Sequence, residues 1–326
     1  MGREDIQSEL HLYCDEPPTK GRIMLHELAN APVHQIEEFF SRISYLTLVN
    51  TPIPWTSRAY HGLVELDFRS DVDGFINIDD FAMALRASPR LRVLRLEQFH
   101  LDPNDGLSLC GSILLEHLEI LFLRSIDTKT AERLLPLIQT GCKPLYMKWQ
   151  PAYRAPSFEP YIHFLRRSRV TKLMIRCFHK EVFPDALLTV LPAVDHLLVE
   201  GFTLNVAFFE SMASPTVHRE DEDMLTFWPR LRTLHLFNCH FYRDLLASEV
   251  LLATPIQFNF MMFCSSCRFW DTDPKGAVIS TKPVSYDSYQ AQALLGSIEA
   301  YIPGFQHVSA VDSGYLTDAW AMALDY

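Results

Sequence analysis

The sequence predicts an α/β fold: a leucine-rich-repeat solenoid with parallel strands on its concave face and helices on its convex face. A six-residue apolar frame, large-x-x-Leu-x-large, returns eight times along the chain. Its spacing lies mostly within or next to the range of a leucine-rich repeat. Between the frames, the apolar pattern changes from period two to helical period, as a strand-plus-helix unit requires.

Each copy of the frame is expected to form a short strand. The copies begin 20, 28, 27, 24, 28, 24 and 37 residues apart. Because alternate residues of a strand face opposite sides, the apolar positions should point inward together. The copies are Ile43-x-x-Leu46-x-Leu48, Leu63-x-x-Leu66-x-Phe68, Leu91-x-x-Leu94-x-Leu96, Leu118-x-x-Leu121-x-Leu123, Cys142-x-x-Leu145-x-Met147, Val170-x-x-Leu173-x-Ile175, Val194-x-x-Leu197-x-Val199 and Leu231-x-x-Leu234-x-Leu236.

Helices are expected after the second, fourth, sixth and eighth strands. After the second strand, Asp79 and Asp80 suit the positive end of a helix, and Ser88-Pro89 ends it. After the fourth strand, Asp127 or Thr128 can cap the next helix. The four apolar stripes are Phe81, Ala84 and Leu85; Leu134, Leu135 and Ile138, before a stop at Gly141; Ala186, Leu187, Val190 and Leu191; and Tyr242, Leu245, Leu246 and Val250.

Stacked repeats share one continuous core, so a single elongated domain with capped ends is expected. The predicted parts are an N-terminal helical cap over residues 1–42, the solenoid over residues 43–270, and a loop with a C-terminal capping helix or tail over residues 271–326. Alternation at Ile256, Phe258 and Phe260 predicts a ninth, degenerate strand. Residues 289–302 are expected to form the closing helix, and residues 214–223, with an acidic run, and 271–287 to form loops.

The composition is that of a folded protein, with 48% apolar and 21% charged residues in 326. A net charge of −11 argues against a sequence-independent nucleic-acid binder. No stretch reaches the roughly 18 apolar residues of a membrane span, and the N-terminus lacks the pattern of a secretory signal. We therefore expect a cytoplasmic or nuclear protein without nucleic-acid or membrane partners. Its seven scattered cysteines are expected to be reduced thiols.

No catalytic constellation, phosphate-binding loop or cofactor motif is found, so we expect no enzyme activity and no cofactor. The best metal candidate is Cys264-x-x-Cys267, because two thiolates at that spacing can bind one zinc ion. Cys239, with His235 or His240, could complete the site if the eighth and ninth strands are adjacent. The alternative interpretation is small core cysteines and exposed histidines, and no metal ligand is assigned.

A protein-binding surface has a firmer basis in the sequence. In a curved solenoid, the residues between the inward apolar positions point outward from the strands. An apolar and aromatic centre flanked by charge is typical of an interface hot spot. The candidate partner-binding residues are Glu65, Asp67, Arg95, Ile120, Phe122, Tyr146, Lys148, Lys172, Arg176, His196 and His235. The alternative is that they are ordinary cross-strand neighbours or are covered by a terminal segment.

The repeat motifs resemble those of fungal F-box-like leucine-rich-repeat proteins over roughly residues 40–260. The likeness rests on Leu91-Arg92-Val93-Leu94-Arg95-Leu96 after Ser88-Pro89, and on Trp228-Pro229-Arg230-Leu231-Arg232-Thr233-Leu234-His235-Leu236. The resemblance implies repeats that present a substrate, and an F-box that docks on the adaptor of a cullin-RING ubiquitin ligase. No Leu-Pro-x-Glu type opening precedes Ile43. Either the F-box is missing from this sequence, or the protein is a bare repeat scaffold.

Two functional hypotheses follow from the sequence. The first is a non-enzymatic interaction scaffold of F-box-like ancestry, linked to ubiquitin ligase recruitment if an F-box exists, that recognises a protein partner on its concave face. The second is a zinc-containing or enzymatic module centred on residues 239–267. A third interpretation is a truncated gene product that folds without any partner.

Overall fold

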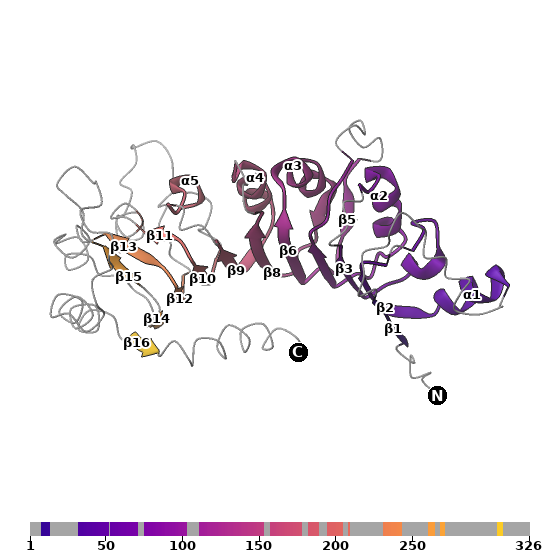
Figure 1. Ribbon diagram of the computed structural model, residues 1–326, viewed down its shortest axis with the longest axis horizontal. Coiled ribbons are helices and arrows are strands. Elements are labelled where there is room, and N and C mark those ends of the chain that lie inside the picture. Colours follow the sequence, from indigo (N-terminus) through magenta and orange to yellow (C-terminus); the bar gives the residue numbers. More distant parts are fainter. Residues whose placement is uncertain are drawn as a thin grey trace. The chain divides into compact units, whose positions relative to one another are not determined.

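The structure is a computed structural model in which the chain forms two compact units, Met1–Val170 and Thr171–Tyr326. Each unit is mixed α/β and is dominated by parallel strands (Figure 1). The division at residue 170 falls inside the range 43–270 that the repeat spacing assigns to one array. The structure describes residues 8–13, 32–51, 53–70, 75–102, 111–152, 157–177, 182–188, 194–204, 208, 231–242, 260–264, 268–270 and 305–308.

The main sheet of the first unit contains six described strands, all parallel and in chain order. They are β1 (Ser8–Tyr13), β2 (Ile43–Val49), β3 (Glu65–Arg69), β4 (Val93–Glu97), β6 (Ile120–Ile126) and β8 (Leu145–Pro151). Parallel neighbours need crossover connections. Accordingly, the helices α2 (Ile78–Arg86), α3 (Thr128–Leu137) and α4 (Glu159–Arg167) lie side by side on one face of this sheet (Figure 1).

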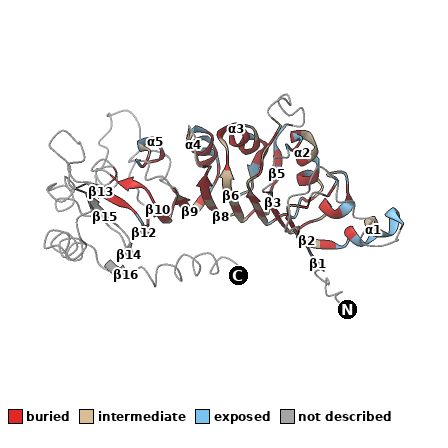
Figure 2. Cartoon of the chain, in the orientation of Figure 1, coloured by how far each residue is buried: buried red, intermediate tan, exposed pale blue. Residues whose placement is uncertain are grey.

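Two rows of apolar side chains cross this sheet and form its core, which is buried in Figure 2. The first row is Leu46, Leu66, Leu94, Leu121 and Met147, each opposite the next. The second row is Leu48, Phe68, Leu96, Leu123 and Trp149. Burying each side chain contributes roughly 1.5–3 kcal/mol before entropy is subtracted. The predicted strands and their inward positions are therefore confirmed for β2, β3, β4 and β6.

The predicted frame is wrong for β8, where it is displaced by two residues. Met147, not Leu145, lies opposite Leu121, and Trp149 lies opposite Leu123. Cys142, the predicted first position of this frame, is exposed and precedes the strand. The physical reason is the size of Trp149, whose ring is fully buried and stacks on Tyr161 with 3.8 Å between the ring centroids.

The helices of the first unit are α1 (Val33–Phe40), η2 (Arg58–Tyr60, a 3-10 helix), α2 (Ile78–Arg86), α3 (Thr128–Leu137) and α4 (Glu159–Arg167). The α2 helix begins where Asn77 accepts hydrogen bonds from the amides of Asp79 and Asp80, which replaces the missing intrahelical partners. Asp127 caps α3 in the same way through the amide of Thr130. The predicted helix starts are confirmed, although Asn77 was not identified as a cap.

The predicted extension of α3 to Ile138 is wrong. Ile138 is extended and begins β7 (Ile138–Thr140), which pairs in parallel with β5 (Ile113–Leu115). Pro136 lies in the last turn, where it removes a hydrogen bond and crowds the preceding turn. The helix therefore ends at Leu137 and is followed directly by β7. Ile138 is buried, but as a residue of this strand and not of the helix.

Within the described part of residues 1–42, which the sequence predicts as a helical cap, the structure has two elements. Helix α1 is one of them, but β1 is a strand that adds to the sheet beside β2. The alternation of Leu10 and Leu12 with the exposed Glu9 and His11 carries this signal. The sequence analysis did not use it.

The second unit repeats the parallel arrangement. Its main sheet is formed by β9 (Val170–Arg176), β10 (His196–Glu200), β12 (Thr233–Phe237), β14 (Phe260–Cys264) and β16 (Phe305–Val308). A second parallel sheet is formed by β11 (Thr203–Leu204), β13 (His240–Tyr242) and β15 (Arg268–Trp270), and α5 spans Asp185–Leu188. Leu173, Leu197 and Leu234 lie opposite one another, and their predicted inward positions are confirmed by complete burial.

The predicted ninth strand exists as β14 beside β12, although it begins only at Phe260. Ile256 and Phe258 lie outside the described residues. The same holds for the predicted loops over 214–223 and 271–287, the closing helix over 289–302, and the helical stripe beyond Tyr242.

A recurring turn follows several strands of both units. Asn50, Gln98, Ser125 and Asn238 all have φ between 50° and 54°, a left-handed conformation that residues other than glycine seldom adopt. Gly201 takes the equivalent place after β10 with φ 78°. A Cβ atom there would lie 1.9 Å from the carbonyl oxygen of Cys177, so this turn requires glycine.

Backbone bonds repeat at the same turn. The amide of Asn50 donates to Arg69 O, that of Gln98 to Arg124 O, and that of Gly201 to Phe237 O. Each bond runs from the end of one strand to the end of the next. Directly after the turn comes a buried residue: Phe99, Ile126, Phe202 or Cys239. The repeat seen in the sequence is therefore also a repeat of backbone geometry.

Candidate protein-interaction surface

The predicted partner-binding residues of the first unit all lie on one side of the main sheet, opposite the core. We call this side the strand face. One row across it is Tyr45, Glu65, Val93, Ile120 and Tyr146. The next row is Thr47, Asp67, Arg95, Phe122 and Lys148. The register thus brings together the seven predicted residues Glu65, Asp67, Arg95, Ile120, Phe122, Tyr146 and Lys148.

A third row was missed by the sequence analysis. It lies two residues further along the strands and consists of Val49, Arg69, Glu97, Arg124 and Gln150. Residues two apart on a strand face the same side, so the alternation itself carried the signal. The six-residue frame ends before this row, and that is why the row was overlooked.

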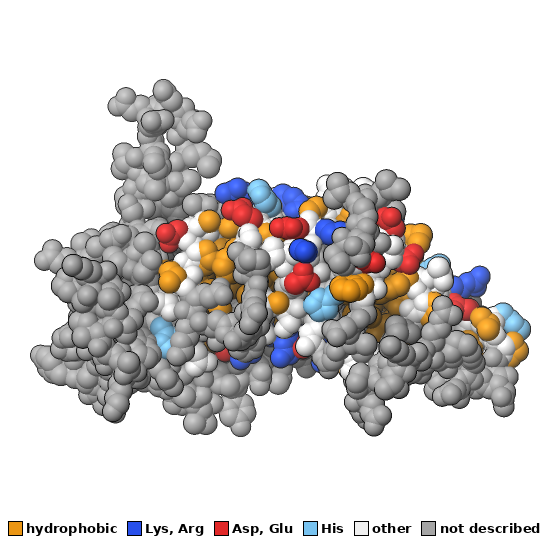
Figure 3. Space-filling view, turned by 45° about the horizontal axis from the view of Figure 1, so that its top comes forward, with side chains coloured by type: hydrophobic (Ala, Val, Ile, Leu, Met, Phe, Trp, Pro, Cys, Tyr) orange, Lys and Arg blue, Asp and Glu red, His pale blue; other side chains and the backbone are white. Residues whose placement is uncertain are grey.

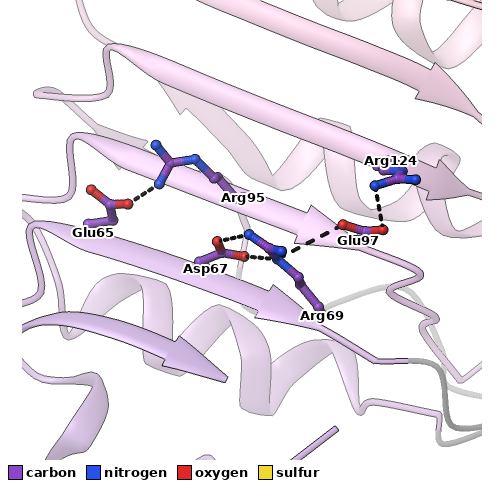
Figure 4. A network of polar contacts seen from close by, with 6 residues as sticks. All are labelled: Glu65, Asp67, Arg69, Arg95, Glu97 and Arg124. Carbon is purple, nitrogen blue, oxygen red and sulfur yellow. Dashed lines mark hydrogen bonds and ion pairs between the residues drawn. The ribbon is translucent and has the colours of Figure 1, made fainter. Parts of the chain in front are cut away.

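The charges of the strand face pair with one another (Figure 4). Arg95 on β4 forms an ion pair with Glu65 on β3. Arg69 binds Asp67 through two parallel bonds, with Nε 3.0 Å from Oδ1 and Nη2 2.7 Å from Oδ2. Such a bidentate interaction fixes the orientation of both side chains. The two acidic side chains of β3, Glu65 and Asp67, are therefore each paired with an arginine.

Glu97 joins two arginines in the third row. Its carboxylate lies 2.9 Å from Arg124 Nη1 and 3.9 Å from Arg69 Nε. The arginine side chains are 47% exposed at Arg69 and 43% at Arg124, whereas Asp67 and Glu97 are only 8% and 18% exposed. The network has equal numbers of both signs, yet Arg69 and Arg124 are more exposed than the carboxylates of Asp67 and Glu97 that they contact.

The predicted aromatic centre lies on β6 and β8. Ile120 and Phe122 are partly exposed, and the ammonium of Lys148 lies 4.9 Å from the centroid of the Phe122 ring. A cation over an aromatic face is attracted by the electrons of the ring. Tyr146 lies in the same row as Ile120 but is buried. The partly exposed apolar surface is therefore centred on Ile120 and Phe122.

The four predicted residues of the second unit also share one side of their sheet. Lys172 lies opposite His196, and Arg176 lies opposite Glu200. Glu200 is buried and forms an ion pair with Arg176, with Oε1 3.0 Å from Nη2. His196 Nδ1 is 2.8 Å from Thr233 Oγ1. The predicted residue His235 lies one row further along, opposite Leu198.

Most of the described side chains on this side of the sheet in the second unit are buried or only partly exposed. Met174, Leu198 and His235 form one row and are 1%, 0% and 6% exposed. Burial, together with the nearby His196, lowers the pKa of His235 to about 4. Burial and the positive charge of Lys172 also lower the pKa of His196. Both rings therefore favour the neutral form at neutral pH.

A smaller charged cluster lies where β4, β6 and β8 begin. Glu119 accepts from Arg92 Nη2 at 2.6 Å and from Lys143 Nζ at 2.7 Å. These partners lower the pKa of Glu119, and its hydrogen bond raises that of Arg92. Exposed pairs of this kind contribute little to stability.

The zinc hypothesis concerns residues that are only partly described. The strands β12 and β14 are adjacent, as the hypothesis required, but Cys267 and the side chain of Cys264 lie outside the described part. Cys239 is buried, with its sulfur 3.3 Å from Phe237 O. No three His, Cys, Asp or Glu side chains within the described residues could hold a metal ion together. Zinc binding stays a prediction.

Other described surfaces carry mixed chemistry. Figure 3 shows a face on which acidic, basic and apolar side chains are interspersed. None of the helices in the described part of the chain is long and apolar enough to cross a membrane. A scan against models of known protein families finds no match, and a search of curated proteins finds no relative.

Proposed function

We propose that this protein is a non-enzymatic interaction scaffold of the leucine-rich-repeat type, and that it binds a protein partner on the strand face of its first unit. The observation that carries the proposal is the combination, on that one face, of the partly exposed Ile120 and Phe122 with a border of paired charges. Interface hot spots combine aromatic anchors with arginine in this way.

The repeat assignment has support beyond the apolar frame. In the leucine-rich repeat, the residue three places after the last frame position is typically Asn or Cys. Cys239 holds that place after Leu236, and its thiol lies 3.5 Å from Val199 O and 3.3 Å from Phe237 O. A small donor at this point can satisfy backbone carbonyls between units. The left-handed residue before it recurs directly after β2, β4, β10 and β12, and at Ser125 near the end of β6.

Recognition suits the strand face better than catalysis. A general acid or base must exchange protons with a substrate at the working pH. Here Asp67 is held by two bonds from Arg69, and Glu65 and Glu97 each face an arginine. These ion pairs hold the charged groups in defined orientations, and oriented charges give a binding surface its specificity.

The link to ubiquitin ligases rests on the repeat resemblance alone. We propose it as a hypothesis in which the strand face holds the substrate and an F-box elsewhere in the protein binds the adaptor of a cullin-RING ligase. The described residues lend it no separate support. A cytoplasmic or nuclear location would accompany this role.

The test is affinity capture with one interface variant and one matched control. Phe122→Ala removes the aromatic anchor from the strand face, whereas Leu114→Ala removes an exposed leucine from β5, outside the main sheet. Loss of a hot-spot side chain typically weakens binding by 2 kcal/mol or more, about thirtyfold.

We expect a defined set of partners to be captured by the wild type and the Leu114→Ala variant and to be lost with Phe122→Ala. Binding of the recovered partner, once purified, should weaken about thirtyfold or more on Phe122→Ala. If both variants retain the same partners with unchanged affinity, the strand face is not the binding surface.

A further inference from the structure

One end of the strand face contains two hydrogen-bond donors, Arg124 and Gln150, that are not fully paired within the described residues. Arg124 on β6 lies directly opposite Gln150 on β8, so their backbones are neighbours in the parallel ladder. Both follow the alternation of the rows that hold Phe122 and Lys148. The two donors therefore lie beside the aromatic centre on the same pair of strands.

Within the described residues, Arg124 is only partly paired and the Gln150 amide nitrogen has no partner. Arg124 makes a single ion pair among the described residues, from Nη1 to Glu97, and its side chain is 43% exposed. A guanidinium has five N–H donors, so most of them are available to another acceptor. Gln150 is only 2% exposed, and its Nε2 has no hydrogen-bond partner among the residues that the structure describes. A buried amide without an acceptor is unfavourable for folding.

We propose that Arg124 and Gln150 form a subsite for a carboxylate side chain of the partner, in a segment whose neighbouring apolar side chain contacts Phe122. This inference rests on the proposed function, because it names the chemistry that the strand face recognises. A carboxylate has oxygen acceptors for the N–H groups of Arg124 and Gln150. Arginine binds a carboxylate in a planar, bidentate geometry.

The charges nearby favour a carboxylate over a phosphate. Glu97 lies 2.9 Å from Arg124 and is partly exposed, so it already offsets part of the positive charge. A dianion placed on Arg124 would also face Glu97, and like charges repel. A singly charged group fits this setting better.

The geometry also predicts a spacing in the partner. Phe122 and Arg124 are two residues apart on β6, which corresponds to about 7 Å along a strand. Residues i and i+2 of an extended segment project to the same side at the same separation. The recognised pattern is therefore an Asp or Glu two positions from a large apolar residue.

A random-peptide display library, selected on the full-length protein, tests this prediction. We expect enrichment of peptides with an acidic residue two positions from an apolar one. Binding of the enriched peptides, measured as synthetic copies, should weaken at least tenfold on Arg124→Met and much less on Arg124→Lys, which keeps the charge. Phe122→Ala should weaken the same peptides.

Gln150→Leu gives a second readout that a purely structural role would not produce. It replaces the buried amide by an apolar group of similar size, so it should raise the unfolding temperature of the free protein. The same change should weaken the acidic peptides several-fold, because it removes a donor from the subsite. A change that lowers stability and leaves binding unchanged would overturn the role of Gln150.

The outcomes separate this inference from the proposed function. Peptides that depend on Phe122 but show no acidic preference would overturn the carboxylate subsite and leave the scaffold proposal standing. Enrichment only of peptides with a free C-terminus, or tighter binding of phosphoserine than of glutamate copies, would also overturn it. Peptides unaffected by Phe122→Ala would count against the proposed function itself.

Discussion

The outward sides of the main-sheet strands follow the same alternation in the two units but differ in their exposure to water. In the first unit, Glu65, Arg95 and Phe122 are partly exposed, and their charges are paired across strands. In the second unit, Met174 and Leu198 at comparable positions are buried. Alternation therefore predicts the side of the sheet to which a residue points, but not whether that side is exposed to solvent. Parallel strands buried on both sides are common in α/β proteins.

This difference changes what each side can do. The first offers partly exposed anchors and oriented guanidinium groups, so it can exchange water for a partner. The second already excludes water from its central row, and its buried His235 has a pKa of about 4. Side chains on both sides of these strands are buried and therefore stabilise the fold. Little of their surface is accessible to a partner.

The largest expected effect comes from truncating side chains on the two sides of each sheet. Leu121→Ala and Leu197→Ala both remove a fully buried core leucine and should each cost about 2–5 kcal/mol. Leu198→Ala should cost a similar amount, because Leu198 is buried on the outward side. Phe122→Ala should cost clearly less than Leu121→Ala, because Phe122 is partly exposed.

Urea unfolding of the four variants measures these differences. If Phe122→Ala were as costly as Leu121→Ala, or if Leu198→Ala were nearly neutral, the contrast between the two units would be wrong.

A smaller effect is expected from pH, through His235. Its pKa falls from an ordinary 6.5 to about 4 in the folded protein, because burial disfavours the charged ring. Stability from this group is fully present above pH 6.5 and is lost as pH falls to about 4, since only the unfolded chain takes up the proton. The loss amounts to at most about 3 kcal/mol.

The His235→Asn variant provides the control, because it cannot titrate in this range. Its unfolding free energy should vary less with pH between 6.5 and 4 than that of the wild type. Asp127 acts in a different window: burial would raise its pKa, but hydrogen bonds with His100 and Thr130 lower it below its ordinary value. Its contribution is lost only as pH falls below about 4. Equal pH dependence in wild type and variant would show that His235 is not buried as neutral imidazole.

Much of the fold could be predicted because local rules agree with the tertiary structure. Leu94 and Leu121 lie opposite each other as the frame requires, and Asp127 caps α3. The frame failed at β8, where the space filled by Trp149 depends on Tyr161 from α4. Packing between elements determines the register of β8. A six-residue sequence pattern contains no information about that packing.

The surface could be predicted only in part. The outward direction of Glu65 and Phe122 followed from alternation, but the pairing of Arg95 with Glu65, rather than with the directly opposite Asp67, did not. Side-chain length and rotamer choice determine such diagonal contacts. The burial of His235 also depends on neighbours that a single strand does not specify.

The central claim is that the strand face of the first unit is the accessible, partner-binding side. Hydroxyl-radical footprinting measures this directly, because oxidation reports side-chain exposure. In the free protein we expect Phe122 and the exposed Met83 to be oxidised and Met174 to be protected. Addition of the purified partner should then protect Phe122 and leave Met83 unchanged. Oxidation of Met174 at the rate of Met83, or a partner that leaves Phe122 as reactive as before, would contradict the account.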